Sequence, residues 1–307
     1  MEERCPGERY LGDLAVDRLQ AQRIFFADFI TASAGIPKKD RRLANAFASV
    51  PRERFVGPGP WKIFTSSGLL ETPSDDPAFL YQDVTVSLAA DRHINNGQPL
   101  LHAICLAALN PAEGQTVLHI GAGTGYYTAI LSRLVGSTGS ILAYEIEQDL
   151  AQRAAINLAD YPNVTVYHRS GSQGLLPDCD AIYVNAGATA PLDVWLDALR
   201  FNGRLLFPLT PSDSPSGAPG AGAMLLVSRP SASANTAPFH AQFVSSAIFI
   251  NCTGARDEDT ARKLSPAFKR GNYRHVRSLH RNSRPDETCW FAGNIWWLST
   301  REIAPHP

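Results

Sequence analysis

The fold of this chain is decided by the stretch Val117-Leu118-His119-Ile120-Gly121-Ala122-Gly123-Thr124-Gly125-Tyr126. The residues before the first glycine predict a buried strand, and a helical pattern follows the last one. Between them lies a turn with glycine at every second position. Glycines let the backbone pass close to a ligand and expose N–H groups at a helix N-terminus, so the stretch predicts a ligand-binding strand–turn–helix unit.

The spacing of the glycines discriminates between ligands. A dinucleotide-binding turn has the pattern G-x-G-x-x-G, whose last glycine would fall at Tyr126 in this chain. The G-x-G-x-G pattern found here favours a methionine-type ligand lying over the turn. Many tight strand-to-helix turns are only structural, so the turn by itself leaves a structural role open.

Predicted strands and helices alternate around this turn. Strands are predicted at Thr116–Ile120, Ser140–Tyr144, Val164–His168, Ala181–Val184 and Arg204–Phe207, and helices at Tyr127–Leu134, Leu150–Ala159 and Leu192–Leu199. Such alternation is typical of a mostly parallel sheet with helices on both faces. We therefore predict an α/β, Rossmann-like fold.

The flanking regions have a different character. Apolar residues at helical spacing predict helices within residues 1–50, and a further helix is predicted to begin at Pro99. Weak alternation predicts a strand at Val84–Leu88, and later strands are predicted at Met224–Val227, Phe243–Ile250 and Ile295–Leu298. Flexible loops are predicted at Pro211–Gly222 and Pro230–Pro238, which are rich in Pro, Ser, Gly and Ala. We expect a helical N-terminal extension (1–50), a core with its preceding segment (51–229) and a C-terminal extension (230–307) that packs on the core.

The composition argues against several classes of partner. The 307 residues carry a formal net charge of −1, so no basic field indicates nucleic acid or an anionic membrane. The locally basic stretch 262–284 is interpreted as a solvated face, because acidic residues flank it. The five cysteines form no C-x-x-C pair, and no metal is expected. The sequence shows neither a secretory signal nor an apolar run of membrane-spanning length, so we expect a cytoplasmic location. We also expect the protein to be a monomer or a homodimer.

An acidic residue follows the second predicted strand of the core. Glu145 lies at the C-terminal end of Ser140–Tyr144, where a carboxylate can bind both hydroxyls of a ribose. Glu147 is a competing candidate, and a surface glutamate at the start of the next helix is the alternative. Asn185 and Thr189 follow the strand 181–184, and ligands of open α/β sheets bind outside that edge. They are candidates to face the acceptor substrate, with ordinary loop hydrogen bonding as the alternative for each.

Further motifs occur in a fixed order along the chain. They are Val50-Pro51-Arg52-Glu53-Arg54-Phe55-Val56, Tyr81-Gln82-Asp83, Gln98-Pro99 with His102-Ala103, the glycine turn with Tyr126, and Gly203-Arg204-Leu205 with Pro208. Together they resemble protein-L-isoaspartate O-methyltransferases over roughly residues 43–250.

The resemblance implies a class I methyltransferase fold that binds S-adenosylmethionine. That family methylates the abnormal α-carboxylate of isoaspartyl residues, and the ester then cyclises to a succinimide. The cofactor-binding residues implied here are Gly121, Ala122, Gly123, Thr124, Gly125, Tyr126, Glu145, Ile146, Ser170, Gly171, Asn185 and Gln98. The acceptor side is expected to involve His102, Asn96, Gly97, Tyr81 and Asp83. The acceptor is then an isoaspartyl carboxylate or another carboxylate presented by a peptide.

The chain departs from the family pattern at three positions. The usual active-site serine, two residues before the proline of a Ser-x-Pro segment, is Gly97 here. Asn95 and Asn96 are candidates to supply amide donors in its place. The acidic residue of the strand before the glycine turn is His119, for which a hydrogen-bonded core position is expected, and the usual adenine-contacting aspartate is Ser170.

Other functions remain open at this stage. One alternative is a methyltransferase that acts on nitrogen or carbon of a small molecule, with His102, Tyr81 or Asp83 as base or polarising group. The Gly97 departure favours that alternative, and Trp290, Trp296 and Trp297 would then wall its pocket rather than anchor the tail. A second alternative is a cofactor-binding protein without catalysis. A dehydrogenase is disfavoured by the glycine spacing.

Overall fold

The computed structural model describes residues 6–212, 220–231 and 238–303, and side chains from Arg18 onward. The chain divides into two compact units, one ending at Ile104 and the other beginning at Cys105. The expected boundaries at residues 50 and 229 stay predictions. Most of the two loops predicted at Pro211–Gly222 and Pro230–Pro238 lies outside the described residues.

The first unit combines helices with two small hairpin sheets. Its elements are α1 (Pro6–Ser33), α2 (Arg42–Ser49), α3 (Glu53–Val56), β1 (Lys62–Thr65), β2 (Gly68–Glu71), η1 (Pro77–Leu80), β3 (Ser87–Ala89), η2 (Ala90–Arg92) and β4 (Ile94–Asn95). Helix α1 ends where expected, because Gly35 has a φ of 77° and Ile36 N donates to Thr31 O (3.1 Å). The strand predicted at Val84–Leu88 is shorter and later than expected. Before β3, Val86 pairs only in an isolated bridge with Ile63, and its N–H donates to Asn96 Oδ1.

The second unit is organised by one sheet, which has ten strands within the described part of the chain. Its order is β13-β14-β12-β11-β10-β9-β8-β5-β6-β7. The strands are β5 (Thr116–Ile120), β6 (Ser140–Glu145), β7 (Val164–His168), β8 (Cys179–Val184), β9 (Leu199–Leu209), β10 (Gly222–Ser228), β11 (Phe239–Ala247), β12 (Ser278–Arg281), β13 (Cys289–Ala292) and β14 (Trp296–Ser299). The helices are α5 (Tyr126–Val135), α6 (Gln148–Asn157), α7 (Asp193–Asp197), α8 (Glu258–Arg270) and η3 (Tyr273–His275). Helix α4 (Pro99–Leu109) begins at the predicted proline and contains the boundary between the units.

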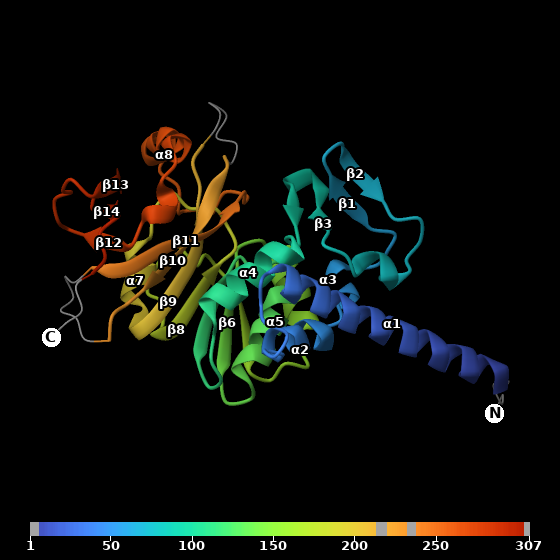
Figure 1. Cartoon of the computed structure of the whole chain (residues 1–307). Coiled ribbons are helices and arrows are strands. Elements are labelled where there is room, and N and C mark those ends of the chain that lie inside the picture. Colours follow the sequence, from blue (N-terminus) through green and yellow to red (C-terminus); the bar gives the residue numbers. More distant parts are fainter. Residues whose placement is uncertain (1–5, 213–219, 232–237, 304–307) are drawn as a thin grey trace. The chain divides into compact units, whose positions relative to one another are not determined.

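The two halves of this sheet differ in strand direction. Strands β7, β6, β5, β8 and β9 are parallel to one another, as the alternation of strands and helices predicts. The strands from β10 to β13 pair antiparallel. Figure 1 shows β8, β9, β10 and β11 side by side, with β12, β13 and β14 continuing beyond β11. The C-terminal strands thus prolong the sheet, and Leu264 and Ala267 of α8 are buried in the same apolar cluster as the sheet residues.

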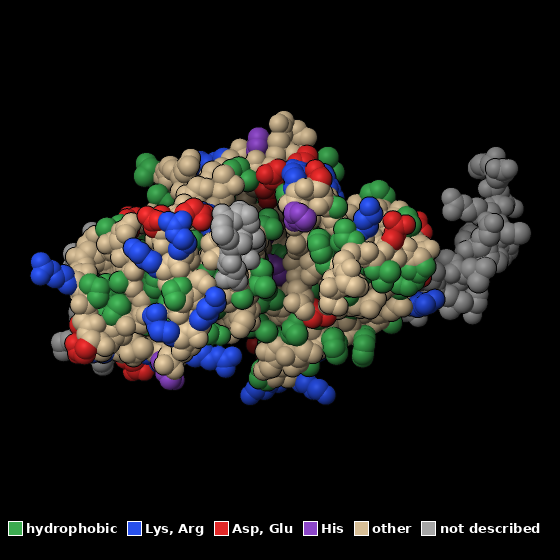
Figure 2. All heavy atoms as spheres, turned by 90° about the horizontal axis from the view of Figure 1, so that it is seen from above, with side chains coloured by type: hydrophobic (Ala, Val, Ile, Leu, Met, Phe, Trp, Pro, Cys, Tyr) green, Lys and Arg blue, Asp and Glu red, His purple; other side chains and the backbone are tan. Residues whose placement is uncertain are grey.

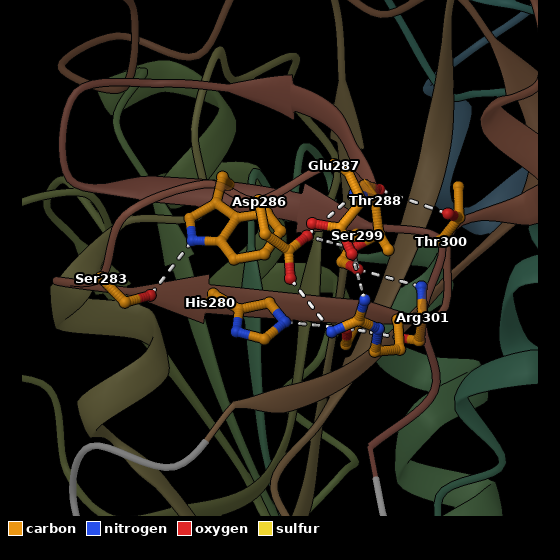
Figure 3. A network of polar contacts seen from close by, with 10 residues as sticks. His280, Ser283, Asp286, Glu287, Thr288, Ser299, Thr300 and Arg301 are labelled. Atoms are coloured by element: carbon orange, nitrogen blue, oxygen red, sulfur yellow. Dashed lines mark hydrogen bonds and ion pairs between the residues drawn. The ribbon is translucent and has the colours of Figure 1, made fainter.

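Polar contacts near the C-terminus join the residues beside the outer strands β13 and β14 (Figure 3). Arg301 pairs with Asp286 (3.1 Å) and Glu287 (2.7 Å), two residues that precede β13. Thr288 and Ser299 share a hydroxyl–hydroxyl hydrogen bond of 2.6 Å. Exposed ion pairs contribute little individually to stability, and here they join the residues before β13 to Arg301, which follows β14.

The three C-terminal tryptophans are core residues. Trp290, Trp296 and Trp297 are between 4% and 8% exposed, and the first two pack in the large apolar cluster of the second unit. Trp297 stacks on His280 with ring centroids 4.1 Å apart. The three tryptophans therefore anchor the outer strands in the core, as expected for large aromatic residues, and do not form an exposed pocket wall.

The locally basic stretch 262–284 is only partly a solvated face. Arg262 pairs with Asp259 on the surface of α8, whereas Arg281 reaches Asp193 (3.0 Å) and Asp197 (2.8 Å) on α7. Figure 2 shows Lys and Arg side chains interspersed with Asp and Glu on the face that it presents. Within the described residues, no helix is both long enough and apolar enough to cross a membrane, and no metal-binding cluster of His, Cys, Asp and Glu occurs.

His119 is a fully buried and hydrogen-bonded core residue, as expected. Its Nδ1 lies 2.8 Å from Thr128 Oγ1 and its Nε2 lies 2.7 Å from Asn185 Nδ2. Burial lowers the pKa of His119 to about 3, so the ring is neutral in the folded protein near neutral pH. An amide NH₂ only donates, so Nε2 accepts from Asn185 and Nδ1–H donates to Thr128.

We predict that His119 contributes to acid destabilisation between about pH 6.5 and pH 3. In that window the unfolded chain binds a proton at His119 and the folded protein does not, so stability rises with pH. The destabilisation caused by His119→Gln should therefore shrink by roughly 2–3 kcal/mol between pH 7.5 and pH 4.5. Urea unfolding of both proteins at the two pH values measures this, and a constant difference would contradict it.

Candidate functional site

The glycine turn connects β5 to α5. Gly121, Gly123 and Gly125 have φ values of 76°, 57° and 99°, in the left-handed region that side chains disfavour. A Cβ atom at Gly125 would also lie 2.7 Å from Leu158 Cδ1. The backbone path therefore needs glycine for its dihedral angles and, at Gly125, for space.

Both neighbouring strands hold the turn at the carboxyl edge of the sheet. Gly121 N and Ala122 N donate to Tyr144 O at 2.9 and 3.2 Å, and Asn185 N donates to Ile120 O at 2.8 Å. On the helix side, Asn157 Nδ2 donates to Thr124 O at 3.0 Å. The turn thus sits where β5 runs between β6 and β8, the place where open α/β sheets bind ligands.

Glu145 closes this region from the end of β6. It is 5% exposed, and its Oε2 accepts from Gly123 N (2.7 Å) while Oε1 accepts from Glu147 N (2.9 Å). Burial raises the pKa of Glu145, against the lowering effect of these backbone hydrogen bonds. The carboxylate of Glu145 thus reaches the glycine turn, and its role as the ribose-binding residue stays a prediction.

Asn185 supplies a direct test of whether a ligand fits here. Its Nδ2 is used by His119, and its Oδ1 is buried with no hydrogen-bond partner among the described residues. An unsatisfied buried carbonyl costs roughly 1–3 kcal/mol, which a ligand N–H would recover. A Cβ at Gly121 would lie 3.6 Å from Asn185 Cβ, so this amide lies beside the turn. S-adenosylmethionine has an amino group and a ribose, so the residues present fit it.

The segment after β7 forms another part of this edge. Ser170 Oγ and Ser172 Oγ are 2.8 Å apart, and Trp195 Nε1 donates to Gly171 O at 2.8 Å. A Cβ at Gly171 would lie 2.7 Å from Ile120, so only glycine brings this segment so close to the strand before the turn. Ile146, by contrast, is 41% exposed and available to a ligand.

A segment that sequence reasoning did not identify also lies at this edge. Cys252 N donates to Gly187 O (2.9 Å), Thr189 N donates to Ala255 O (3.1 Å) and Ser172 Oγ donates to Thr253 O (2.8 Å). These contacts hold both the loop after β8 and the segment after β7. The predicted strand Phe243–Ile250 ended just before this segment. The one local signal in the sequence was the glycine at position 254, which adopts a positive φ of 80° in the structure.

Among the acceptor candidates of the first unit, Asp83 has a structural task. Its Oδ1 accepts from Leu100 N and its Oδ2 accepts from Gln98 Nε2, both at 2.8 Å. Leu100 lies in the first turn of α4, where backbone N–H groups lack helical partners. Asp83 thus caps α4 from a distant loop and holds Gln98 at its start.

Tyr81 belongs to a polar network with charged neighbours. Its hydroxyl donates to Glu53 Oε2 and accepts from Arg23 Nε (2.8 Å) and Arg52 N (3.2 Å), while Arg23 also pairs with Glu53. Burial, followed by the interaction with Glu53, raises the pKa of Tyr81. The hydroxyl is therefore protonated at neutral pH and is not poised to act as a base.

Arg52 is a further residue that organises this region and that sequence reasoning noted only as part of a motif. Its fully buried guanidinium donates from Nη1 to Leu80 O (2.6 Å) and Gln82 O (3.0 Å), and from Nη2 to Val84 O. Nη2 also lies 3.5 Å from Asn96 Oδ1. The guanidinium of Arg52 thus hydrogen-bonds to three carbonyls of the loop that carries Tyr81 and Asp83.

The structure brings most of the expected cofactor set together within the second unit. The glycine turn with Tyr126, Glu145, Ile146, Ser170, Gly171 and Asn185 lie along the carboxyl ends of β5 to β8. Gln98 lies in the first unit beside Asp83, with Tyr81, Asn96, Gly97 and His102. The direct contacts of these residues with cofactor and acceptor stay predictions.

Comparisons with known proteins agree with this geometry. A family model described as "Protein-L-isoaspartate(D-aspartate) O-methyltransferase (PCMT)" matches residues 31–216. The protein-L-isoaspartate O-methyltransferase of Roseiflexus sp. (strain RS-1) is 35% identical over 179 residues, which cover 56% of this chain and 71% of that protein. Its namesake from Methanococcoides burtonii is 32% identical over 174 residues, 55% of this chain and 77% of that protein.

Solved structures share the fold. A protein-L-isoaspartate O-methyltransferase superposes with a TM-score of 0.59 at 22% identity, covering 79% of this chain and 68% of that one. A Plasmodium falciparum protein described as a putative member of the same family, in complex with S-adenosyl-L-homocysteine, gives 0.57 at 17% identity, covering 76% and 98%. The predicted α/β, Rossmann-like methyltransferase fold is confirmed. Residues after 216, including the segment 251–255, lie outside the part matched by the family model.

We predict that Gly123→Val abolishes cofactor binding. A branched side chain at a φ of 57° occupies the place where the ligand passes and strains the backbone. Gly271→Val is the matched control, since it has a φ of 76° and no atom within 4 Å of its Cβ position. Calorimetric titration of both folded variants measures the effect. Near-wild-type affinity in Gly123→Val would place the site elsewhere.

We predict that Glu145→Ala weakens cofactor binding by about 1.5–3 kcal/mol, through loss of charged hydrogen bonds to the ribose. Wild-type affinity should fall on acidification as the carboxylate is protonated. Because burial raises the pKa of Glu145 above its ordinary value of 4.5, the fall should begin at a higher pH than for an exposed glutamate. The variant should lack this pH dependence, and Glu147→Ala should retain it. Titrations from pH 8 to pH 5 test the assignment, which an unaffected Glu145→Ala would refute.

Proposed function

Since this chain belongs to the protein-L-isoaspartate O-methyltransferase family and is an S-adenosylmethionine-dependent methyltransferase, we propose that it methylates a carboxylate presented by a peptide. The isoaspartyl α-carboxylate is the first candidate acceptor, because the relatives bear that name. Another peptide carboxylate is the second. The observation that carries the proposal is the family match over residues 31–216, which spans both the acceptor candidates and the glycine turn.

Methyl transfer to a carboxylate does not require a strong acid or base from the protein. A carboxylate with a reference pKa near 4 is ionised at pH 7 and is already a nucleophile. S-adenosylmethionine, when bound, supplies a methyl group activated by its sulfonium. The residues of this chain have to align the acceptor oxygen with that methyl group and exclude water.

The polar groups of the second unit suit the binding part of this task. The turn Gly121–Gly125 gives close backbone approach, Glu145 offers a carboxylate to ribose hydroxyls, and Asn185 Oδ1 offers a buried acceptor to an amino group. Rigid supports surround them, since the neighbouring strands and the segment 251–255 fix the loops from which they project. Such preorganisation lowers the entropy lost on alignment.

A small-molecule N- or C-methyltransferase is the second candidate, and Gly97 is the observation that favours it. Such an acceptor needs a base or a polarising group. Tyr81 and Asp83 are poorly suited to that task, because their side-chain oxygens are engaged within the first unit. A cytoplasmic location and the absence of nucleic-acid and membrane partners stay predictions.

The proposal is tested with labelled S-adenosylmethionine on an isoaspartyl peptide and its normal aspartyl twin, after calorimetry has confirmed cofactor binding. We expect methylation that prefers the isoaspartyl peptide and is released by mild base, as a methyl ester is. Ester formation on the aspartyl twin alone would identify the second carboxylate acceptor. Tight cofactor binding without transfer to either peptide would refute a peptide carboxylate and favour a small-molecule acceptor.

A further inference from the structure

Two serines after β7 are hydrogen-bonded to each other and to the C-terminal part of the chain. Ser172 Oγ lies 2.8 Å from Thr253 O and 2.8 Å from Ser170 Oγ, and Ser172 N lies 3.1 Å from Ser170 Oγ. Ser172 is 8% exposed, whereas Ser170 is half-buried. A backbone carbonyl at Thr253 is thus linked through Ser172 to a hydroxyl that is partly exposed at the carboxyl edge of the sheet.

The direction of these hydrogen bonds follows from the number of protons. A carbonyl oxygen only accepts, so Ser172 Oγ–H donates to Thr253 O. Two oxygens 2.8 Å apart repel each other unless a proton lies between them, so Ser170 Oγ–H donates to Ser172 Oγ. Ser170 Oγ also accepts from Ser172 N. Within the described part of the chain, the Ser170 hydroxyl therefore has one lone pair, and no proton, left for a ligand.

The backbone around Thr253 is fixed at this edge by the loop after β8. Cys252 N donates to Gly187 O (2.9 Å) on one side of Thr253. On the other side Gly254 has a φ of 80°, and a Cβ built on it would lie 2.6 Å from Ser172 Oγ. Glycine at position 254 therefore allows the close approach of Ser172 to Thr253 O.

The strand order indicates which part of the cofactor meets Ser170. The methionine part is expected at the glycine turn after β5, and Glu145 at the end of β6 is the candidate for the ribose. Strand β7 pairs with β6 on the side away from β5, and Ser170 follows the last residue of β7 by two positions. A ligand that extends from the turn past Glu145 therefore brings its base toward Ser170.

We propose that Ser170 Oγ accepts a hydrogen bond from the exocyclic amino group of adenine, and that Thr253 O, acting through Ser172, holds the Ser170 hydroxyl in this accepting orientation. Ser172 and Thr253 are positioning residues, since they act through Ser170. An oxygen that only accepts is what a carboxylate at position 170 would present, so the relay reproduces that property without a charge. The inference rests on the use of S-adenosylmethionine and holds whichever acceptor is methylated.

The arrangement discriminates against a base that carries a carbonyl in place of the amino group. S-inosylhomocysteine differs from S-adenosylhomocysteine in this way, and its carbonyl oxygen would face the lone pair of Ser170. We expect the wild-type protein to bind the adenosyl compound roughly 10- to 100-fold more tightly. Calorimetric titration with each compound measures this preference, and equal affinities would overturn the proposal.

Ser172→Ala tests the orientation of the hydroxyl. The variant lacks the oxygen to which Ser170 donates, so the Ser170 hydroxyl can turn its proton toward a ligand carbonyl. The preference should fall to about 3-fold or less, mainly because S-inosylhomocysteine binds more tightly. A purely structural role of Ser172 would weaken both ligands by the same factor. An unchanged preference would therefore refute the positioning role.

Ser170→Asp provides a matched background, because a carboxylate only accepts and needs no relay. This variant should keep the preference for S-adenosylhomocysteine, and adding Ser172→Ala should no longer reduce it. A reduction of equal size in the Ser170 and Asp backgrounds would show that Ser172 does not act through the hydroxyl, and the relay would be wrong.

The contribution of Thr253 O is tested at the next residue. Gly254→Ala places a Cβ against Ser172 Oγ and should reduce the preference as Ser172→Ala does. Gly271→Ala is the control, since Gly271 has a φ of 76° and no atom within 4 Å of its Cβ position. Urea unfolding establishes that both variants are folded. A wild-type preference in Gly254→Ala would overturn the role of Thr253.

These titrations are independent of the methyl acceptor. If the isoaspartyl peptide is not methylated while the expected preferences are found, the proposed acceptor is wrong and the role of the two serines stands. If the peptide is methylated and the wild type binds both compounds equally, the proposed function stands and the role of the serines is wrong.

Discussion

The second unit depends on one constraint, the path of the backbone from β5 into α5. Three residues of that turn adopt left-handed dihedral angles, and both flanking strands hydrogen-bond to it through Tyr144 O and Asn185 N. Parallel pairing on both sides of β5 places the ends of β6 and β8 beside the turn. Glu145 and Asn185 therefore both lie beside the turn, and His119 holds Asn185 from inside the core.

The C-terminal residues extend the sheet of this unit and also contact the loops at its carboxyl edge. Antiparallel strands continue the sheet beyond β9, and buried tryptophans anchor its outer end. On the way, the segment 251–255 crosses the carboxyl edge and binds the loops that carry Thr189 and Ser172. These supports lie after residues 31–216, the part of the chain that the family model matches.

In the first unit, buried polar groups shape the loop next to α4. Arg52 binds the loop carbonyls of Leu80, Gln82 and Val84. Asp83 caps the helix, and Tyr81 joins the Arg23–Glu53 pair. A buried cation without hydrogen bonds is costly, so the loop and the guanidinium stabilise each other. The outcome is a fixed turn at Asn96 and Gly97, against which His102 packs.

The sequence by itself determined the local elements, because hydrophobic periodicity and glycine spacing act over a few residues. The turn at Gly121–Gly125, the strands of the parallel half, the proline start of α4 and the core position of His119 were all readable in this way. Tertiary structure alone decided the pairing of β11 with β12, the role of the segment 251–255 and the engagement of Asp83 with Gln98 and Leu100. It also decided that the imidazole of His102 fills the space at Gly97. These features join positions whose contacts depend on side-chain packing in three dimensions, and no local pattern records such contacts.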